Sequence, residues 1–271
     1  SPSTMITTTT KKTPSLIVAH IVGLALLTLI LQGFLSFSTI TDALGFYGVY
    51  HRDPTNQLIH FFGVPFIIWS MIVFLAHLNV PRLPLPLPLP LTLNKLRLPG
   101  TKPHRITYAS IVVVIYIGFY LYLDSFGGIL YAPFAYGMYV TAVNFTMKDQ
   151  TKALRELKQT QSIDTCSSST GKISTAAPWS GTGRALKLAG IVHLLGWYVQ
   201  IHPGHGIYEG AKPAVLQSIG GALTAAPLFA YYEGLWWMGL NKGLQLETKL
   251  LVDEYTVDLC RNGAKMRACR D

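Results

Sequence analysis

The feature that most constrains this chain is a set of apolar runs, each about as long as a membrane is thick. A helix needs about 20 consecutive apolar residues to cross the hydrocarbon core of a bilayer. The sequence of 271 residues offers six such runs, at about 16–37, 61–80, 106–123, 128–147, 185–201 and 215–240. Only 13% of its residues are charged, whereas a soluble domain carries about 25%. These features exclude a disordered chain, argue against a soluble enzyme and predict an all-α, polytopic membrane bundle of five to six transmembrane helices.

The first run, 16–37, has two interpretations. Lys11 and Lys12 precede it as a short basic lead, which is also typical of a signal peptide. Its apolar stretch is longer than the roughly 7–15 residues of a signal-peptide core, so we expect a retained span. The fifth run, 185–201, is the shortest, and it is either tilted or partly interfacial.

Topology explains the net charge of +9 better than a nucleic-acid partner does. Cytoplasmic loops of membrane proteins accumulate Lys and Arg. With six crossings, 19 of the 22 basic residues fall on one side, in the segments 1–15, 81–105, 148–184 and 241–271. The opposite side holds only Arg52 and Lys212. The count predicts that both termini are cytosolic, and we expect no nucleic acid as a partner.

The three cysteines, Cys166, Cys260 and Cys269, all fall in segments that this topology places in the cytosol. They show no CxxC spacing, which would indicate a metal or redox site. Because cytosolic thiols stay reduced, we expect all three to be free thiols without a catalytic role.

Two short polar segments interrupt the apolar background, and the first lies directly before the second run. It contains His51 and His60. Pro54 forbids a continuous helix between them, and a cap at Thr55 or Asn56 is expected for the helix that follows. His60 should therefore lie in the first turn of that helix, with His51 on a separate element that folds back over it.

The second polar segment lies between the fifth and sixth runs. It contains His202 and His205, separated by Pro203 and Gly204 in an expected turn and followed by Glu209. Two imidazoles and a carboxylate at this spacing can converge on one metal ion, although the spacing alone is weak evidence.

The number of crossings strengthens the case for a shared site. Four crossings separate the two segments, so both emerge on the same membrane face whether or not the first run spans. The four histidines can therefore form one metal site at that face. Polar groups are costly in a membrane and usually mark function, but the alternative is that these histidines only cap helices at the interface.

Other polar groups inside apolar runs are weaker candidates. His20 and His193 could ligate a haem, although histidines that pack between helices explain them more simply. Glu233, inside the sixth run, could be a hydrogen-bond partner for a histidine.

At the two polar segments the chain resembles the Mpo-type 2-hydroxy-fatty-acid dioxygenases, a family of membrane proteins. The first matching motif is Leu44-Gly-Phe-Tyr-x-x-Tyr50-His51-x-x-Pro54-x-Asn56-x-Leu-Ile-His60. The second is Trp197-x-x-Gln200 followed by Gly204-His205-Gly206-x-x-Glu209, Pro213-Ala214 and Ala226-Pro227, leading to Glu233. The resemblance divides the chain into an N-terminal segment with an extra span (1–42), a catalytic membrane domain (43–240) and an amphipathic cytosolic tail (241–271).

The resemblance implies an endoplasmic-reticulum enzyme that uses Fe(II) and O2 to shorten a lipophilic 2-hydroxy fatty acid by one carbon, with release of CO2 and without 2-oxoglutarate. By position, His51, His60 and His205 match the metal-binding histidines of the family. His202 does not, because Gln-Ile-His-Pro-Gly-His is one residue longer here than the usual Gln-Phe-x-Gly-His. We predict the first three as metal ligands and His202 as a fourth.

The chemistry of these residues agrees with that function. Neutral imidazoles suit Fe(II), and a cluster with open positions suits oxygen activation. A 2-hydroxy acid can bind iron through its carboxylate and its hydroxyl, with the acyl tail among the spans. Gln200 and Glu209 are placed to orient an imidazole through its other nitrogen, and Tyr47 and Tyr50 are predicted to bound the head-group pocket.

Two other functions stay open at this stage. A diverged family member could use the same iron site on another lipophilic substrate, such as a secondary metabolite, and the inserted His202-Pro203 favours this. A membrane scaffold with capping histidines would bind no metal. The expected partners are O2, the lipophilic substrate and membrane lipid, while the oligomeric state is left open.

The charge count places the histidine face away from the cytosol, although fatty acids are usually handled on the cytosolic side.

Overall fold

The computed structural model describes residues 14–80, 106–167, 179–264 and 266–269. Within these residues the protein is helical and contains no β-strand, so the all-α prediction is confirmed. The α-helices are α1 (Pro14–Phe34), α2 (Ile40–Gly48), α3 (Pro54–Ala76), α4 (Tyr108–Leu123), α5 (Ser125–Ser167), α6 (Arg184–Val199), α7 (Ile219–Trp237) and α8 (Lys242–Arg261). A π-helix, η2 (Gln200–Glu209), and two 3-10 helices, η3 (Ala214–Leu216) and η4 (Arg267–Cys269), connect or follow them.

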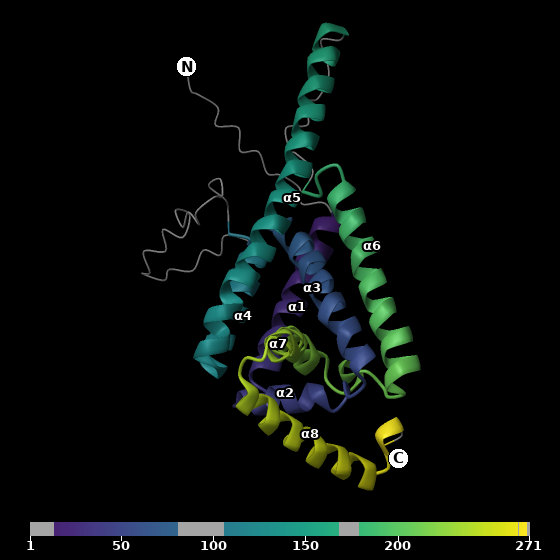
Figure 1. Cartoon of the computed structure of the whole chain (residues 1–271). Coiled ribbons are helices and arrows are strands. Elements are labelled where there is room, and N and C mark those ends of the chain that lie inside the picture. The colour runs from purple at the N-terminus through teal and green to yellow at the C-terminus, as the bar shows by residue number, and fades with distance from the viewer. Residues whose placement is uncertain (1–13, 81–105, 168–178, 265, 270–271) are drawn as a thin grey trace.

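Five helices, α1, α3, α4, α5 and α6, run lengthwise beside one another (Figure 1). Among the described residues, three segments are long and apolar enough to cross a membrane, namely Ser15–Phe34, Pro54–Ala76 and Ser125–Thr160. Helix α4 is apolar but shorter. The five lengthwise helices correspond to the first five predicted runs.

The prediction that the run 215–240 crosses the membrane is wrong. Helix α7 is seen end-on in Figure 1, where it lies across the lengthwise helices close to α2. Its first turn touches the last turn of α1, since a Cβ on Gly33 would lie 2.1 Å from the carbonyl oxygen of Gly220. Near its other end, Tyr232 donates a hydrogen bond to Asp124, at the junction of α4 and α5. Both ends of α7 therefore lie at the same end of the bundle.

A proline inside α7 is compensated by a tyrosine of α4. Pro227 has no N–H, so the carbonyl of Leu223 loses its helical partner. Tyr116 donates to that carbonyl at 2.7 Å, and Tyr120 donates to the carbonyl of Thr224 at 2.8 Å. Both tyrosines are buried, so the two bonds fix α7 against α4 in the core.

Helix α8 packs against α2 at the end of the bundle where α7 lies (Figure 1). Arg52, which follows α2, forms an ion pair of 2.8 Å with Asp253 and donates a hydrogen bond of 2.9 Å to Thr256. Because α7 does not cross, residues of 241–271 lie at the same end as His51, and the prediction that they lie on opposite sides is wrong.

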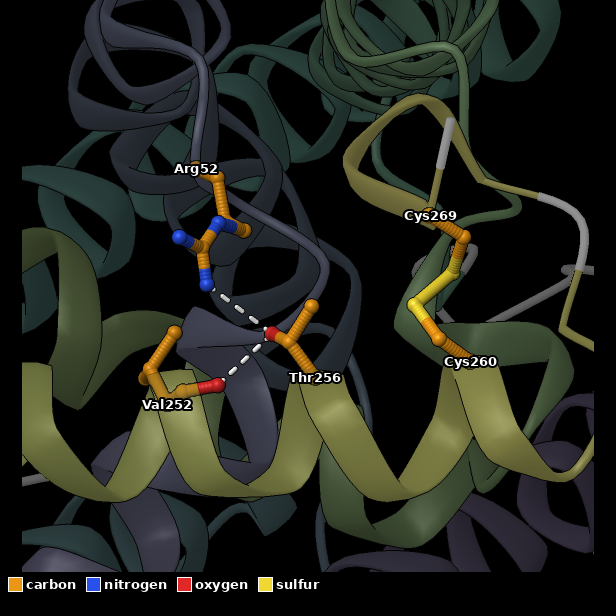
Figure 2. The surroundings of a disulfide bond; sticks show 5 residues. All are labelled: Arg52, Val252, Thr256, Cys260 and Cys269. Atoms are coloured by element: carbon orange, nitrogen blue, oxygen red, sulfur yellow. Dashed lines mark hydrogen bonds between the residues drawn. A yellow bond between two sulfur atoms is a disulfide. The ribbon is translucent and has the colours of Figure 1, made fainter. Parts of the chain in front are cut away.

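The expectation of three free thiols is also wrong. Cys260 and Cys269 form a disulfide that joins the end of α8 to η4 (Figure 2). The chain reverses between them at Gly263, which has a φ of 82°. Met266, within this reversal, is buried against Val49 and Val252. The disulfide therefore holds the end of the chain against the segment that carries His51.

Candidate metal centre

The structure brings His51, His60 and His205 together at one point. His51 follows α2, His60 lies on α3 and His205 lies in η2, and one ligand atom from each falls within 4.8 Å of the others. All three side chains are buried, with exposures of 1%, 2% and 3%. The ring centroids lie 4.3, 4.7 and 5.0 Å apart, with the planes nearly perpendicular. Such a set of three nitrogen donors can hold a transition-metal ion.

Backbone carbonyls orient two of the three imidazoles. His51 Nδ1 lies 2.8 Å from the carbonyl oxygen of Tyr47, and His60 Nδ1 lies 2.9 Å from that of Asn56. A carbonyl only accepts, so each Nδ1 carries the proton and each Nε2 keeps a free lone pair. Metal-binding histidines are commonly held in this way. His51 Nε2 and His205 Nδ1 are buried and have no hydrogen-bond partner among the described residues, so both atoms are available as metal ligands.

Burial also sets the protonation of the two histidines outside the spanning helices. It lowers the pKa of His51 well below the usual range, and the neighbouring His60 and His205 lower it further. Burial, followed by the effect of His60, lowers the pKa of His205 to about 3. Both rings are therefore neutral at pH 7, which is the form that binds metal.

The segment between His51 and His60 is fixed by Asp53. Its carboxylate accepts from the N–H of Thr55 at 2.8 Å and of Asn56 at 3.1 Å, so Asp53 is the N-cap of α3 and Pro54 occupies the first helical position. The predicted cap at Thr55 or Asn56 is therefore two or three residues too late.

Glu209 joins η2 to this same segment. One carboxylate oxygen accepts from the N–H of Arg52 at 2.9 Å, and the other accepts from the N–H of Asp53 and from Asn56 Nδ2, each at 3.0 Å. These bonds differ from the predicted contact with an imidazole. Glu209 instead holds the segments that carry His51, His60 and His205 in one arrangement.

The second polar segment forms a π-helix rather than the expected turn. Pro203 lies inside it and cannot donate a backbone hydrogen bond, which suits the wider winding. Gly204 packs closely on α3, since a Cβ there would lie 2.5 Å from Asn56 Oδ1. The absence of a side chain at Gly204 thus allows His205 to approach His60.

The other predicted site residues lie in different places. His202 is exposed, and its ring stacks on Tyr198 at 5.5 Å, so the structure does not bring it to the cluster. Tyr50 packs against Phe46 and lines pockets without a histidine. Tyr47, in contrast, stacks on His51, with the rings 3.9 Å apart, and it lies beside the cluster.

A cavity of about 50 Å³ lies against the cluster. It is lined by His51, His60 and His205, by apolar side chains of α3, η3 and α7, and by Tyr47, Trp197 and Gln200. Gln200 is buried and its Nε2 has no hydrogen-bond partner. The amide is therefore available to an oxygen atom bound in the cavity, which differs from the predicted role of orienting an imidazole.

A second pocket of about 220 Å³ lies on another side of His51, between α7 and α8. Glu233, Trp236 and Thr248 line it, and their buried polar atoms have no hydrogen-bond partner. Glu233 therefore does not bond a histidine as predicted. Trp236 and Thr248 were not predicted as site residues from the sequence.

His20 and His193 serve packing rather than a shared haem. His193 hydrogen-bonds Ser70 of α3 at 2.9 Å and accepts from Trp197 Nε1 at 3.0 Å. The ring of His20 lies against Tyr108, 5.8 Å between centroids.

The fold and site define a helical protein of membrane type with a buried three-histidine centre suited to a transition metal. The model of one family, described as 2-hydroxy-palmitic acid dioxygenase Mpo1-like, matches residues 37–235. The chain therefore belongs to the Mpo1-like family, and the resemblance noted from its motifs is confirmed. Neither a curated protein nor a solved structure gives a match.

Proposed function

We propose that this protein is an Fe(II)-dependent dioxygenase that converts a lipophilic 2-hydroxy fatty acid and O2 into the acid one carbon shorter, CO2 and water. The observation that supports this most is the cluster of His51, His60 and His205, buried and neutral, in a member of a family described as dioxygenases. Bound Fe(II) would supply the activation of O2 there.

The reaction balances without a further reductant. Oxidation of the hydroxyl-bearing carbon to a carboxyl group releases three electrons, and conversion of the original carboxyl group to CO2 releases one. These four electrons reduce O2 fully, so no 2-oxoglutarate is required.

The residues around the cluster have distinct parts in this proposal. The Tyr47 ring holds the His51 imidazole in place by stacking. Gln200 donates its free N–H to an oxygen of the substrate head group. The apolar side chains of the cavity exclude water, which would otherwise compete for the open metal positions.

Metal analysis and product analysis test this function directly. Purified protein should contain iron, and His51→Ala and His60→Ala should lose it while still inserting into membranes. His202→Ala is the matched control, because His202 is exposed outside the cluster. Normal iron content in the first two variants would reject the metal site.

The reaction is tested with 2-hydroxypalmitate under O2. Mass spectrometry should show the acid one carbon shorter, with CO2 matching the loss of substrate and no dependence on 2-oxoglutarate. A product that retains every substrate carbon would favour the alternative of a diverged family member acting on another lipophilic compound. Protein that binds no metal would favour a scaffold. We also propose the endoplasmic-reticulum membrane as its location, which fluorescence microscopy of the tagged protein can test.

A further inference from the structure

A large apolar groove lies beside the metal cavity. It is formed by α3, α5 and α7 and has a volume of about 390 Å³. Its lining includes Phe61, Tyr131, Met138, Ala230 and Leu235. We call it the α3–α5–α7 groove. Apart from tyrosine hydroxyls, these lining side chains carry no polar group.

The volumes of the metal cavity and the groove indicate which part of a ligand each of them can hold. The metal cavity measures about 50 Å³, and the groove is about eight times larger. The cavity has room for the small polar end of a ligand beside the histidines, but not for a long alkyl chain as well. A ligand with a polar head and a long tail therefore needs a second space next to the cavity.

The groove is the apolar space that adjoins the cavity. Val64 and Ile68 of α3 and Pro227 of α7 line both. One layer of side chains thus separates the two spaces. The pocket between α7 and α8 also borders His51, but it is lined by Glu233, Lys249 and Asp253, which do not suit an alkyl chain.

We propose that the α3–α5–α7 groove holds the acyl tail of the substrate while its head group lies at the histidines, with the tail passing between α3 and α7 at Val64, Ile68 and Pro227. This proposal rests on the proposed function and adds the site that makes the enzyme select long single-chain acids. It also assigns a route of entry, because Phe62, Phe66 and Phe134 are exposed at the groove. The tail can enter from the hydrocarbon region of the membrane.

The first experiment measures chain-length selectivity in variants that fill the groove. Ala230→Leu and Met138→Trp add volume at residues that line the groove but not the metal cavity. Val114→Trp on α4 is the control, because Val114 is 64% exposed and lines neither space. The kcat/KM of each is measured for 2-hydroxypalmitate and 2-hydroxyoctanoate, together with iron content.

The expected change follows from the burial of methylene groups. Each methylene excluded from an apolar site lowers binding about fourfold, so two or three displaced methylenes lower the ratio of long-chain to short-chain kcat/KM by about 15- to 60-fold. Iron content should stay near the wild-type value, and turnover of 2-hydroxyoctanoate should fall much less than that of 2-hydroxypalmitate. Met138 of α5 is only half-buried, so its variant provides the test if Ala230→Leu fails to fold.

The second experiment locates the tail without relying on turnover. A 2-hydroxy acid of palmitate length with a diazirine at the tail end is crosslinked to the wild-type protein by light. Peptides from α5 and α7 that carry Met138, Ala230 or Leu235 should be labelled, and unlabelled 2-hydroxypalmitate should compete.

The outcomes distinguish the two proposals. An unchanged chain-length ratio in both groove variants, or crosslinks confined to α6 or α8, would overturn the tail site while leaving the dioxygenase function intact. Absence of turnover of either acid by iron-loaded wild-type protein would instead reject the proposed function, and the tail site with it.

Discussion

Glu209→Gln is predicted to weaken the metal centre although the hydrogen bonds of Glu209 go to Arg52, Asp53 and Asn56 rather than to a clustered histidine. The carboxylate accepts three hydrogen bonds, two of them from the backbone N–H groups of Arg52 and Asp53 and one from Asn56. A glutamine oxygen can keep the two bonds to Asp53 and Asn56. Its NH2 group would then face the N–H of Arg52, so two donors oppose each other in a buried place.

The magnitude follows from these contacts. A hydrogen bond to a charged group contributes about 1.5–3 kcal/mol, and an unsatisfied buried donor adds a further penalty, so we expect a cost of about 2–4 kcal/mol in folding free energy. Arg52 directly follows His51 in the chain. Displacement of its backbone should lower metal affinity by about 10- to 100-fold, as for other residues that support metal ligands.

The assay combines thermal denaturation in detergent with competition between the protein and a chelator for Fe(II). Glu156→Gln is the matched control, because Glu156 forms only an exposed pair of 3.7 Å with Lys152 and such pairs contribute about 0–1 kcal/mol. If Glu209→Gln denatures at the wild-type temperature and holds Fe(II) equally well, the hydrogen bonds to Glu209 do not support the centre.

Three further predictions follow from the same region. Metal-free protein should lose stability as the pH falls from about 6.5 towards 3, by up to about 1.4 kcal/mol per pH unit for each of His51 and His205. The reason is that their lowered pKa values make the folded state bind fewer protons than the unfolded state. A flat profile of denaturation temperature against pH would contradict this. Cys260→Ser should lower stability by about 2–3 kcal/mol through loss of the short loop closed with Cys269, and reduction of the wild type should give the same shift in denaturation temperature. Glu233→Leu should raise the denaturation temperature, since it removes a buried carboxyl group without a partner; a fall would show that the folded state needs the carboxyl group.

The three clustered histidines could be predicted because two signals in the sequence are independent of detailed packing. Pro54 breaks the chain between His51 and His60, and an even number of crossings brings His205 to the same face. His202 could not be separated from His205 by such arguments. The wide winding of η2 turns His205 inward and leaves His202 exposed on Tyr198, and sequence composition does not report that winding.

The direction of α7 was not predictable for a different reason. An apolar run has the same composition whether it crosses a membrane or lies across a bundle. What decides the direction is a set of contacts distant in sequence, including the close approach of Gly33 to Gly220 and the bond from Tyr232 to Asp124. The disulfide between Cys260 and Cys269 depends likewise on the chain reversal after α8.

The position of α8 gives a last prediction, which concerns the side of the membrane that the histidine end faces. Placing 241–271 at that end moves six basic residues, so the counts become 13 away from the histidines against eight near them. The charge rule still directs the histidine end away from the cytosol, and the disulfide in that segment favours an oxidising compartment.

Engineered glycosylation tests this orientation, because N-linked sugars are attached only on the luminal side. Ala264→Thr creates the acceptor sequence Asn-Gly-Thr at Asn262, which is exposed just after α8. Leu96→Thr creates the same type of sequence at Asn94, in the connection between α3 and α4. After expression in eukaryotic cells, the first variant should show a larger mass that an endoglycosidase removes, and the second should not. The reverse pattern would place the histidine end in the cytosol, and the charge bias and the disulfide would then need another explanation.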